Sequence, residues 1–273
     1  MLRRRDMLLG STAALAAAAC SGRRSGPASS APRPVGARTI RHDPAAPTAM
    51  LGAHCDDLPF HCWHYLTTVR PLVCVDMFMA VPPAGTTATD ARMGTYDAVE
   101  YMKVRRAEEK EVLARAGAVP PVFLSGLDMP YRSQEPPNLG VLAGELIDAV
   151  PVASRMVAPL GLGNRIRVGT PTYSHVDHKL VRDVADSFPH VPKTYYAEIY
   201  ALSKKSSDYG ELIEHMRAYR HWSLTRIDLT PAQLKAKRAA LELYRSQLAG
   251  LLADVPDILS DGVLSTELYW TPA

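Results

Sequence analysis

Short apolar runs alternate along this chain with segments that have the pattern of amphipathic helices, and this alternation limits the folds open to it. Strands that alternate with helices form a mostly parallel sheet with helices on both faces. The 273 residues are enough for one large domain of this kind. We therefore predict a single α/β domain with strands at 48–53, 72–80, 122–127, 165–169 and 194–200 and helices at 59–69, 99–116, 177–187 and 231–252. A long loop is predicted at 82–97, and Thr230 is the predicted cap of the last helix.

Ionisable residues follow three of these predicted strands. The three clusters are His54, Asp56 and Asp57 after the first strand, Asp128 after the third, and His175, Asp177 and His178 after the fourth. In an open parallel sheet, ligands bind beyond the carboxyl ends of the strands. We therefore expect the three clusters to converge on one rim of the sheet.

The residue types in these clusters suit a catalytic metal site. Catalytic zinc takes three protein ligands from histidine, aspartate or glutamate and keeps a fourth position for water, whose pKa it lowers. A neighbouring carboxylate can then accept the proton of that water. Each cluster alone has a simpler interpretation, because residues 54–57 are also typical of a turn with an aspartate helix cap and residues 175–178 of an exposed helix start.

The combination of motifs resembles the LmbE-like, or PIG-L, deacetylases. Residues 54–57 (HCDD) resemble the family's His-Pro-Asp-Asp-Glu motif, and residues 175–178 (HVDH) resemble its His-Pro-Asp-His motif. Residues 106–109, followed by Gly117, are similar to its Arg-Glu-Ala-Glu helix, and residues 237–247 are similar to its late helix. The order and spacing agree over roughly residues 47–270.

The resemblance implies a Rossmann-like fold, one zinc ion per chain, and hydrolysis of the N-acetyl group of a small-molecule or glycan substrate, often a glucosamine derivative. By position, the implied zinc ligands are His54, Asp57 and His178. The implied catalytic residues are Asp56 as general base, His175 as oxyanion stabiliser and Asp177, which orients a neighbouring imidazole. The implied substrate contacts are Asp128 and Arg106, or Arg105 if the alignment shifts by one residue.

Two residues depart from the family pattern. Cys55 stands where the family has proline, and Leu58 stands where it usually has glutamate. These departures leave open a catalytically degenerate, carbohydrate-binding lipoprotein on the same fold. A zinc amidase that acts on another amide is a separate alternative, which a substrate screen would decide. Cys55 as a metal contact and His61 with His64 as a second metal pair are further alternatives.

The N-terminus has the pattern of an export signal. A basic head is followed by a short apolar run that ends in small residues before Cys20, which is typical of a signal peptide over 1–19. Residues 4–8 resemble a twin-arginine signal, and residues 17–20 resemble a lipobox. We expect an exported chain that is tethered to the membrane only through lipid on Cys20, or else a soluble product cleaved after Ala19.

The segment at 20–46 is rich in Ser, Gly, Pro and Ala, which indicates a flexible tether before a domain at 47–273. Removal of the signal, with three arginines and one aspartate, lowers the formal charge by two, from +3 to about +1. No nucleic-acid partner is expected at this charge. The cysteines beyond Cys20 are Cys55, Cys62 and Cys74, an odd number that does not predict a disulfide framework, although one pair could form a disulfide after export.

Overall fold

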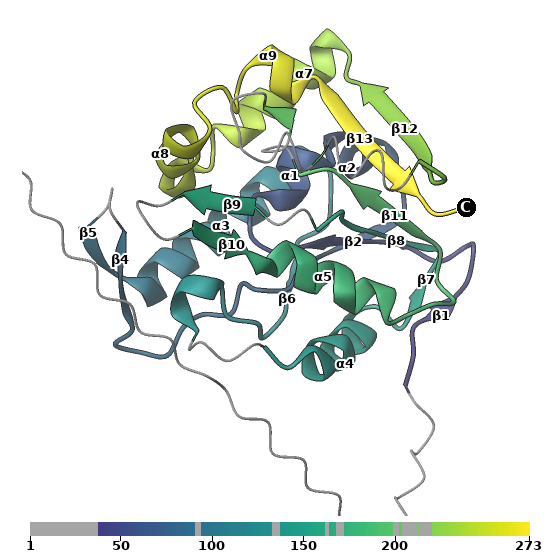
Figure 1. The fold of residues 1–273 in the computed structure, drawn as a ribbon, viewed down its shortest axis with the longest axis horizontal. Helices are drawn as coiled ribbons and strands as arrows, with labels where there is room; N and C mark the ends of the chain where they lie inside the picture. The colour runs from purple at the N-terminus through teal and green to yellow at the C-terminus, as the bar shows by residue number, and fades with distance from the viewer. Residues whose placement is uncertain are drawn as a thin grey trace, which may run out of the picture. The chain divides into compact units, whose positions relative to one another are not determined.

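Figure 1 shows the fold of the chain in a computed structural model. The structure describes residues 38–90, 94–132, 137–161, 164–167, 172–198, 202–203, 212 and 220–273, with the side chains at 89–90, 164–167, 172–175 and 254 excepted. The described residues belong to one compact unit, Arg38–Ala273. The predicted signal peptide lies outside the described residues.

The centre of this unit is a seven-stranded sheet in the order β12-β13-β11-β8-β2-β3-β6. The five strands from β11 to β6 are parallel, whereas β13 and β12 add an antiparallel edge. This confirms the predicted α/β class with a mostly parallel sheet. The strands are β2 (Thr48–Gly52), β3 (Leu72–Asp76), β6 (Val122–Phe123), β8 (Arg155–Pro159), β11 (Lys193–Tyr196), β12 (Ser223–Asp228) and β13 (Thr266–Thr271).

Helices cover both faces of the sheet (Figure 1). One face packs against α4 (Leu139–Ala149) and α5 (Val176–Asp186). The other face packs against α1 (Asp57–His61), α2 (Trp63–Thr68), α3 (Ala98–Arg115), α7 (Pro231–Leu241), α8 (Arg245–Asp254) and α9 (Asp261–Leu264).

The side chains of β2 show how the two cores divide. Ala49 and Leu51 enter the core under α4 and α5, whereas Met50 enters the core on the opposite face. Successive strand residues point to opposite faces, so a strand buried on both sides is apolar throughout. Tyr195 and Tyr196 divide between the faces in the same way, as their positions in the sequence predict.

Two of the predicted helices are each divided in two. The helix predicted at 59–69 breaks at Cys62, because buried Glu267 accepts hydrogen bonds from the backbone N–H groups of Trp63 (2.8 Å) and His64 (3.0 Å). The helix predicted at 231–252 becomes α7 and α8. Its predicted Thr230 cap is confirmed, with a complete capping box.

Two other sequence predictions are wrong. The predicted loop at 82–97 contains a hairpin, with β4 (Thr87–Asp90) paired to β5 (Gly94–Asp97). The strand predicted at 165–169 is not in the central sheet, because β9 (Asn164–Arg167) pairs only with β10 (Thr172–His175). Its place is taken by β8, whose buried run Met156–Pro159 is short and ends in a proline, which weakens its sequence signal.

Two further strands and one short helix complete the described elements. Arg41–His42 (β1) pairs with Val152–Ala153 (β7), so part of the segment assigned to the tether pairs with a strand of the domain. The short helix η1 is Met129–Tyr131. None of the helices described is both long and apolar enough to cross a bilayer.

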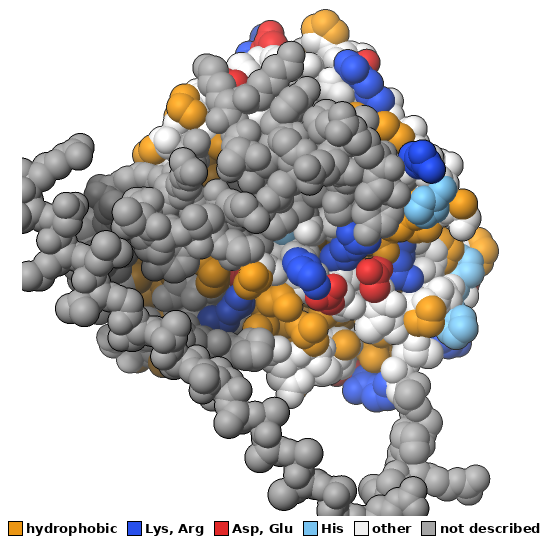
Figure 2. Space-filling model, in the orientation of Figure 1, with side chains coloured by type: hydrophobic (Ala, Val, Ile, Leu, Met, Phe, Trp, Pro, Cys, Tyr) orange, Lys and Arg blue, Asp and Glu red, His pale blue; other side chains and the backbone are white. Residues whose placement is uncertain are grey.

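The outer face of α5 carries paired charges of opposite sign. Lys179 Nζ lies 2.6 Å from Asp183 Oδ2, and Arg182 Nε lies 3.6 Å from Asp186 Oδ2. Figure 2 shows basic and acidic side chains next to one another over this region. Such i,i+4 pairs contribute little to stability, but they neutralise the charge on this helix face.

Candidate active site

The turn between β2 and α1 is folded around the carboxylate of Asp57. Its Oδ2 accepts hydrogen bonds from the backbone N–H groups of Ala53 (2.8 Å) and His54 (2.9 Å). Asp56 precedes α1 but makes no side-chain cap hydrogen bond. The turn is therefore not the simple aspartate cap that the sequence also allowed, because Asp57 organises the backbone with one oxygen and keeps the other for the site.

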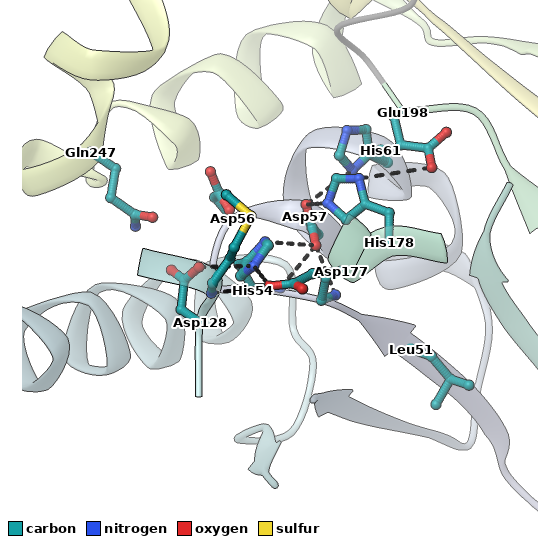
Figure 3. Close-up of polar contacts among 12 residues, drawn as sticks. Leu51, His54, Asp56, Asp57, His61, Asp128, Asp177, His178, Glu198 and Gln247 are labelled. Atoms are coloured by element: carbon teal, nitrogen blue, oxygen red, sulfur yellow. Dashed lines mark hydrogen bonds and ion pairs between the residues drawn. The ribbon is translucent and has the colours of Figure 1, made fainter. Parts of the chain in front are cut away.

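The first turn of α5 brings a second group of side chains to the same place. His178 Nε2 lies 3.1 Å from Asp57 Oδ1. His54, Asp57 and His178 are all buried, and each offers a ligand atom within 4.8 Å of the others. Figure 3 shows the three side chains pointing toward one another from the turn after β2, from α1 and from α5. Two imidazoles and one carboxylate fit a catalytic zinc or a similar divalent metal.

The charges within this cluster are strongly coupled. Burial alone would raise the pKa of Asp57, but His178 and His54 hold that pKa well below its usual range. The pKa of His178 is raised by Asp57 even though burial opposes the change. Carboxylates and imidazoles therefore stabilise one another's charged forms in a site from which water is largely excluded.

A second group that could hold a metal shares His54 with the first. His54 Nε2 lies 3.1 Å from Asp177 Oδ2 and 3.4 Å from Asp128 Oδ1. Each of these carboxylates is already paired with an arginine, Asp128 with Arg105 and Asp177 with Arg132. The two guanidinium groups repel a cation, so His54, Asp57 and His178 are the better metal site.

Asp177, on α5, contacts two other segments, residues 129–132 and the turn after β2. Its carboxylate accepts a hydrogen bond from Arg132 and another from the backbone N–H of Met129 (3.3 Å), and it faces His54 Nε2. Burial would raise its pKa, but the contacts with His54 and Arg132 lower the pKa of Asp177. The described imidazole that Asp177 orients is therefore that of His54.

Asp56 lies beside the metal-binding group, with a carboxylate that has no hydrogen-bond partner among the described residues. Burial and the neighbouring Asp57 raise the pKa of Asp56 to about 7. Its backbone has φ 104° and ψ −31°, a conformation that is rare outside glycine. The backbone N–H of Asp56 donates to Glu109 Oε2 at 3.0 Å.

Arg105, rather than Arg106, reaches the site from α3. Arg105 Nη1 donates to Asp128 Oδ2 and Arg105 Nε donates to Gln247 Oε1, each at 2.8 Å. Arg106 instead lies over the Phe123 ring, 4.3 Å from its centroid, and lines a separate groove. Of the two arginines, Arg105 therefore lies beside the site and Arg106 does not, because they lie on different faces of α3, and the contact with substrate stays a prediction.

Glu198 and His61 complete the surroundings of His178. The sequence offers His61 only as half of an alternative metal pair with His64, and it does not single out Glu198. Glu198 Oε1 lies 3.8 Å from His178 Nδ1 and accepts the Gly161 backbone N–H at 2.8 Å. Burial raises the pKa of Glu198 to about 7. His61 stacks on Tyr196 with 5.2 Å between ring centroids. An acidic residue just after a buried strand was the available signal for Glu198.

The remaining predicted residues lie away from this centre or outside what is described. The side chain of His175 is not among the described ones, and its role stays a prediction. Cys55, Cys62 and Cys74 are buried with free thiols, and burial raises the pKa of each. Cys55 packs with Met79 and Met102. It is not a member of either group that could hold a metal among the described residues.

Comparison with known proteins gives matches at the level of structure. No protein-family model matches the sequence, and no curated protein matches it. A deacetylase triple mutant (Orf2*T) of the teicoplanin biosynthetic pathway superposes with a TM-score of 0.60 at 19% identity, covering 82% of this chain and 97% of that one. The chain has the fold of this deacetylase. The Rossmann-like fold that the LmbE-like resemblance implies is thereby confirmed.

Two further structures agree with this match. The zinc-inhibited form of the teicoplanin deacetylase Orf2 has a TM-score of 0.60 at 18% identity and covers 82% of this chain and 97% of its own. The A40926 pseudoaglycone deacetylase Dbv21 has a TM-score of 0.58 at 16% identity, with 83% and 96% covered. These similarities extend over most of each chain, so the fold is shared as a whole.

Proposed function

We propose that this protein is a zinc-dependent hydrolase that removes an N-acetyl group from an amino-sugar-like substrate. The observation that carries the proposal is the convergence of His54, Asp57 and His178 on one point beside the Asp56 carboxylate. The deacetylase fold agrees with it. The reaction adds water across the amide, breaks the C–N bond, and yields acetate and a free amine.

Zinc is the metal we propose for this site. Two neutral imidazole nitrogens and one carboxylate oxygen are its usual ligands in hydrolases, and three protein ligands leave a position open for substrate or water. A zinc ion held there supplies a Lewis acid that lowers the pKa of water and polarises a carbonyl. Asp57 Oδ2 is fixed by two backbone N–H groups, which leaves Oδ1 oriented toward the site before any metal binds.

Asp56 is the proposed general base. Its carboxylate is next to the proposed ligands, is 5% exposed, and is not engaged by any other described side chain. It can therefore accept a proton from the attacking water and return it to the departing amine. We further propose that His175 stabilises the oxyanion, a role that rests on its place in the 175–178 motif.

The other side of the site suits a polar, hydroxyl-bearing substrate. Arg105 and Asp128 form a buried ion pair at the rim, and Gln247 joins it from α8. The Gln247 Nε2 amide group is buried without a hydrogen-bond partner among the described residues. Such groups hydrogen-bond sugar hydroxyls well, because each offers donors or acceptors in a fixed direction.

Export is also part of the proposal, and its support is the sequence of residues 1–20 alone. We propose an extracytoplasmic protein with a lipid on Cys20 as its membrane tether. Fractionation of cells that express the full chain tests this, because the protein should appear in the membrane fraction and a Cys20→Ala variant should not. Recovery of both proteins in the cytoplasmic fraction would contradict the proposal.

The deciding experiment measures metal content and acetate release together. The wild-type chain should hold one zinc ion and release acetate from N-acetylglucosamine. Asp56→Asn should keep the zinc and lose about 10²–10⁴-fold in turnover, the usual contribution of a general base. The surface variant Asp183→Asn is the control and should match the wild type.

Other results would favour the alternatives. A chain without zinc and without acetate release would favour the carbohydrate-binding protein. Zinc-dependent cleavage of another amide, with N-acetylglucosamine left intact, would favour the other amidase. Unchanged turnover in Asp56→Asn would overturn the assignment of the base.

A further inference from the structure

Asp56 has an unusual backbone conformation. Among the described residues it is the single non-glycine with a positive φ, at 104°. L-residues adopt this region rarely, and they remain there only when the surrounding structure holds them. Its carbonyl oxygen accepts the Phe60 N–H at 3.0 Å, which is a bond within the first turn of α1. A second contact must therefore hold the backbone N–H of Asp56.

The group that holds the N–H side is Glu109 on α3. Glu109 Oε2 accepts the Asp56 N–H at 3.0 Å, and its side chain is fully buried. Loss of this acceptor would leave a buried N–H without a hydrogen bond, which costs more free energy than the bond itself contributes. This contact therefore fixes the peptide plane between Cys55 and Asp56, which sets the φ of Asp56 and the direction of its side chain.

Glu109 is held in turn by the start of α8. The Tyr244 hydroxyl donates to the same oxygen, Oε2, and the buried Tyr244 ring stacks on Phe60 with 6.2 Å between centroids. One turn earlier on α3, Arg105 Nε donates a hydrogen bond to Gln247 Oε1 on α8. Glu109 and Arg105 are four residues apart on one face of α3, so the C-terminal segment anchors that face at two points.

Resting on the proposed function, we infer that Glu109 is the positioning residue for the general base. It holds Asp56 in the left-handed conformation in which its carboxylate lies beside the metal-binding group, and Tyr244 holds Glu109 in place. Leu58 replaces the glutamate of the family motif in the same turn, so the support for this turn comes from α3. Without Glu109, Asp56 relaxes toward negative φ and its carboxylate leaves the site.

The kinetic test compares two variants of the same size. Glu109→Met removes the acceptor, whereas Glu109→Gln keeps an oxygen for the Asp56 N–H and the Tyr244 hydroxyl. Because a misplacement of about 1 Å can cost about 100-fold, Glu109→Met should lose roughly that factor in kcat, with KM within about twofold and zinc content unchanged. Glu109→Gln should recover most of the loss.

Glu108→Gln is the matched control. Glu108 also joins α3 to the start of α8, through the Ser246 N–H (2.9 Å) and hydroxyl (2.6 Å), but it does not contact Asp56. Its kcat should match the wild type. If Glu109→Met fails to fold, Tyr244→Phe removes only the hydroxyl and should lower kcat in the same direction by a smaller factor.

A crystal structure of Glu109→Met tests the inference without any assay, since the φ of Asp56 should become negative. A retained φ near 104°, or an unchanged kcat, would overturn it. A wild-type chain that releases no acetate would instead contradict the proposed function, while the crystal structure would still decide whether Glu109 positions Asp56. Equal loss in Glu109→Met and Glu108→Gln would show that joining α3 to α8, rather than holding Asp56, is what matters.

Discussion

Asp57 Oδ1 and His178 Nε2 lie 3.1 Å apart, although 121 residues separate them in the chain. Hydrogen bonds within its own turn hold the Asp57 carboxylate in place, whereas the position of His178 depends on the packing of α5 on β8 and β2. The proposed metal ligands therefore come together only in the folded chain, and a metal that binds them should stabilise that fold.

Removal of His178 should abolish tight metal binding. His178→Ala leaves one imidazole and one carboxylate, and the affinity should fall by more than the about 10–100-fold that loss of an outer partner costs. Elemental analysis after dialysis measures this directly. His64→Ala is the control, because His64 is on α2 and belongs to neither metal-binding group found among the described residues. Metal retained in His178→Ala but lost in His64→Ala would place the site elsewhere.

Arg105 and Arg106 should differ sharply when each is changed to lysine. Lysine keeps the charge but cannot hold Asp128 and Gln247 at once, because it lacks the planar fork of guanidinium donors. We expect Arg105→Lys to lower kcat/KM by about 10-fold or more, which corresponds to roughly one charged hydrogen bond. Arg106→Lys should behave like the wild type. Steady-state kinetics decide, and equal losses in both variants would refute the assignment of Arg105 alone to the substrate site.

The three buried thiols should be unreactive in the folded chain. Burial raises the pKa of Cys55, Cys62 and Cys74, and the thiolate is the reactive form. A Cys20→Ala variant should therefore show no rapid reaction with a thiol reagent, and all three thiols should react after denaturation. Fewer than three reactive thiols in denaturant, without reductant, would reveal a disulfide that the structure lacks among its described residues.

Local patterns predict much of this fold. The apolar runs at 48–53 and 72–80 contain β2 and β3, and Thr230 starts α7 with a capping box. These features depend on neighbours in the sequence, which a pattern can capture. The candidate metal ligands could also be predicted from the sequence, because they stand directly after strands or at the start of a helix.

Contacts between segments that are distant in the sequence could not be predicted in this way. Nothing near Glu109 in the sequence shows that it accepts the N–H of Asp56, and Glu267 likewise breaks a helix 203 residues away. The choice between Arg105 and Arg106, however, was available from helix phase. Met102, Arg105 and Glu109 share the buried face of α3, whereas Arg106 and Lys110 lie over the Phe123 ring.

Removal of one partner from the buried pair of Lys237 and Glu267 should destabilise the fold strongly. Lys237 Nζ lies 2.9 Å from Glu267 Oε1, and both side chains are almost completely buried. Glu267 also accepts hydrogen bonds from the start of α2 and from Tyr269. Lys237→Met leaves a buried carboxylate without its cation, which should lower the free energy of unfolding by about 3–5 kcal/mol.

Urea denaturation measures this free energy, and Lys179→Met provides the control. Lys179 pairs with Asp183 on the exposed face of α5, where loss of the pair should cost less than about 1 kcal/mol. A double variant, Lys237→Met with Glu267→Gln, should recover part of the loss because no unpaired charge remains buried. If Lys237→Met unfolds at the same urea concentration as Lys179→Met, the prediction is wrong. The hydrogen bonds from α2 and Tyr269 would then be enough to stabilise the buried Glu267 carboxylate without Lys237.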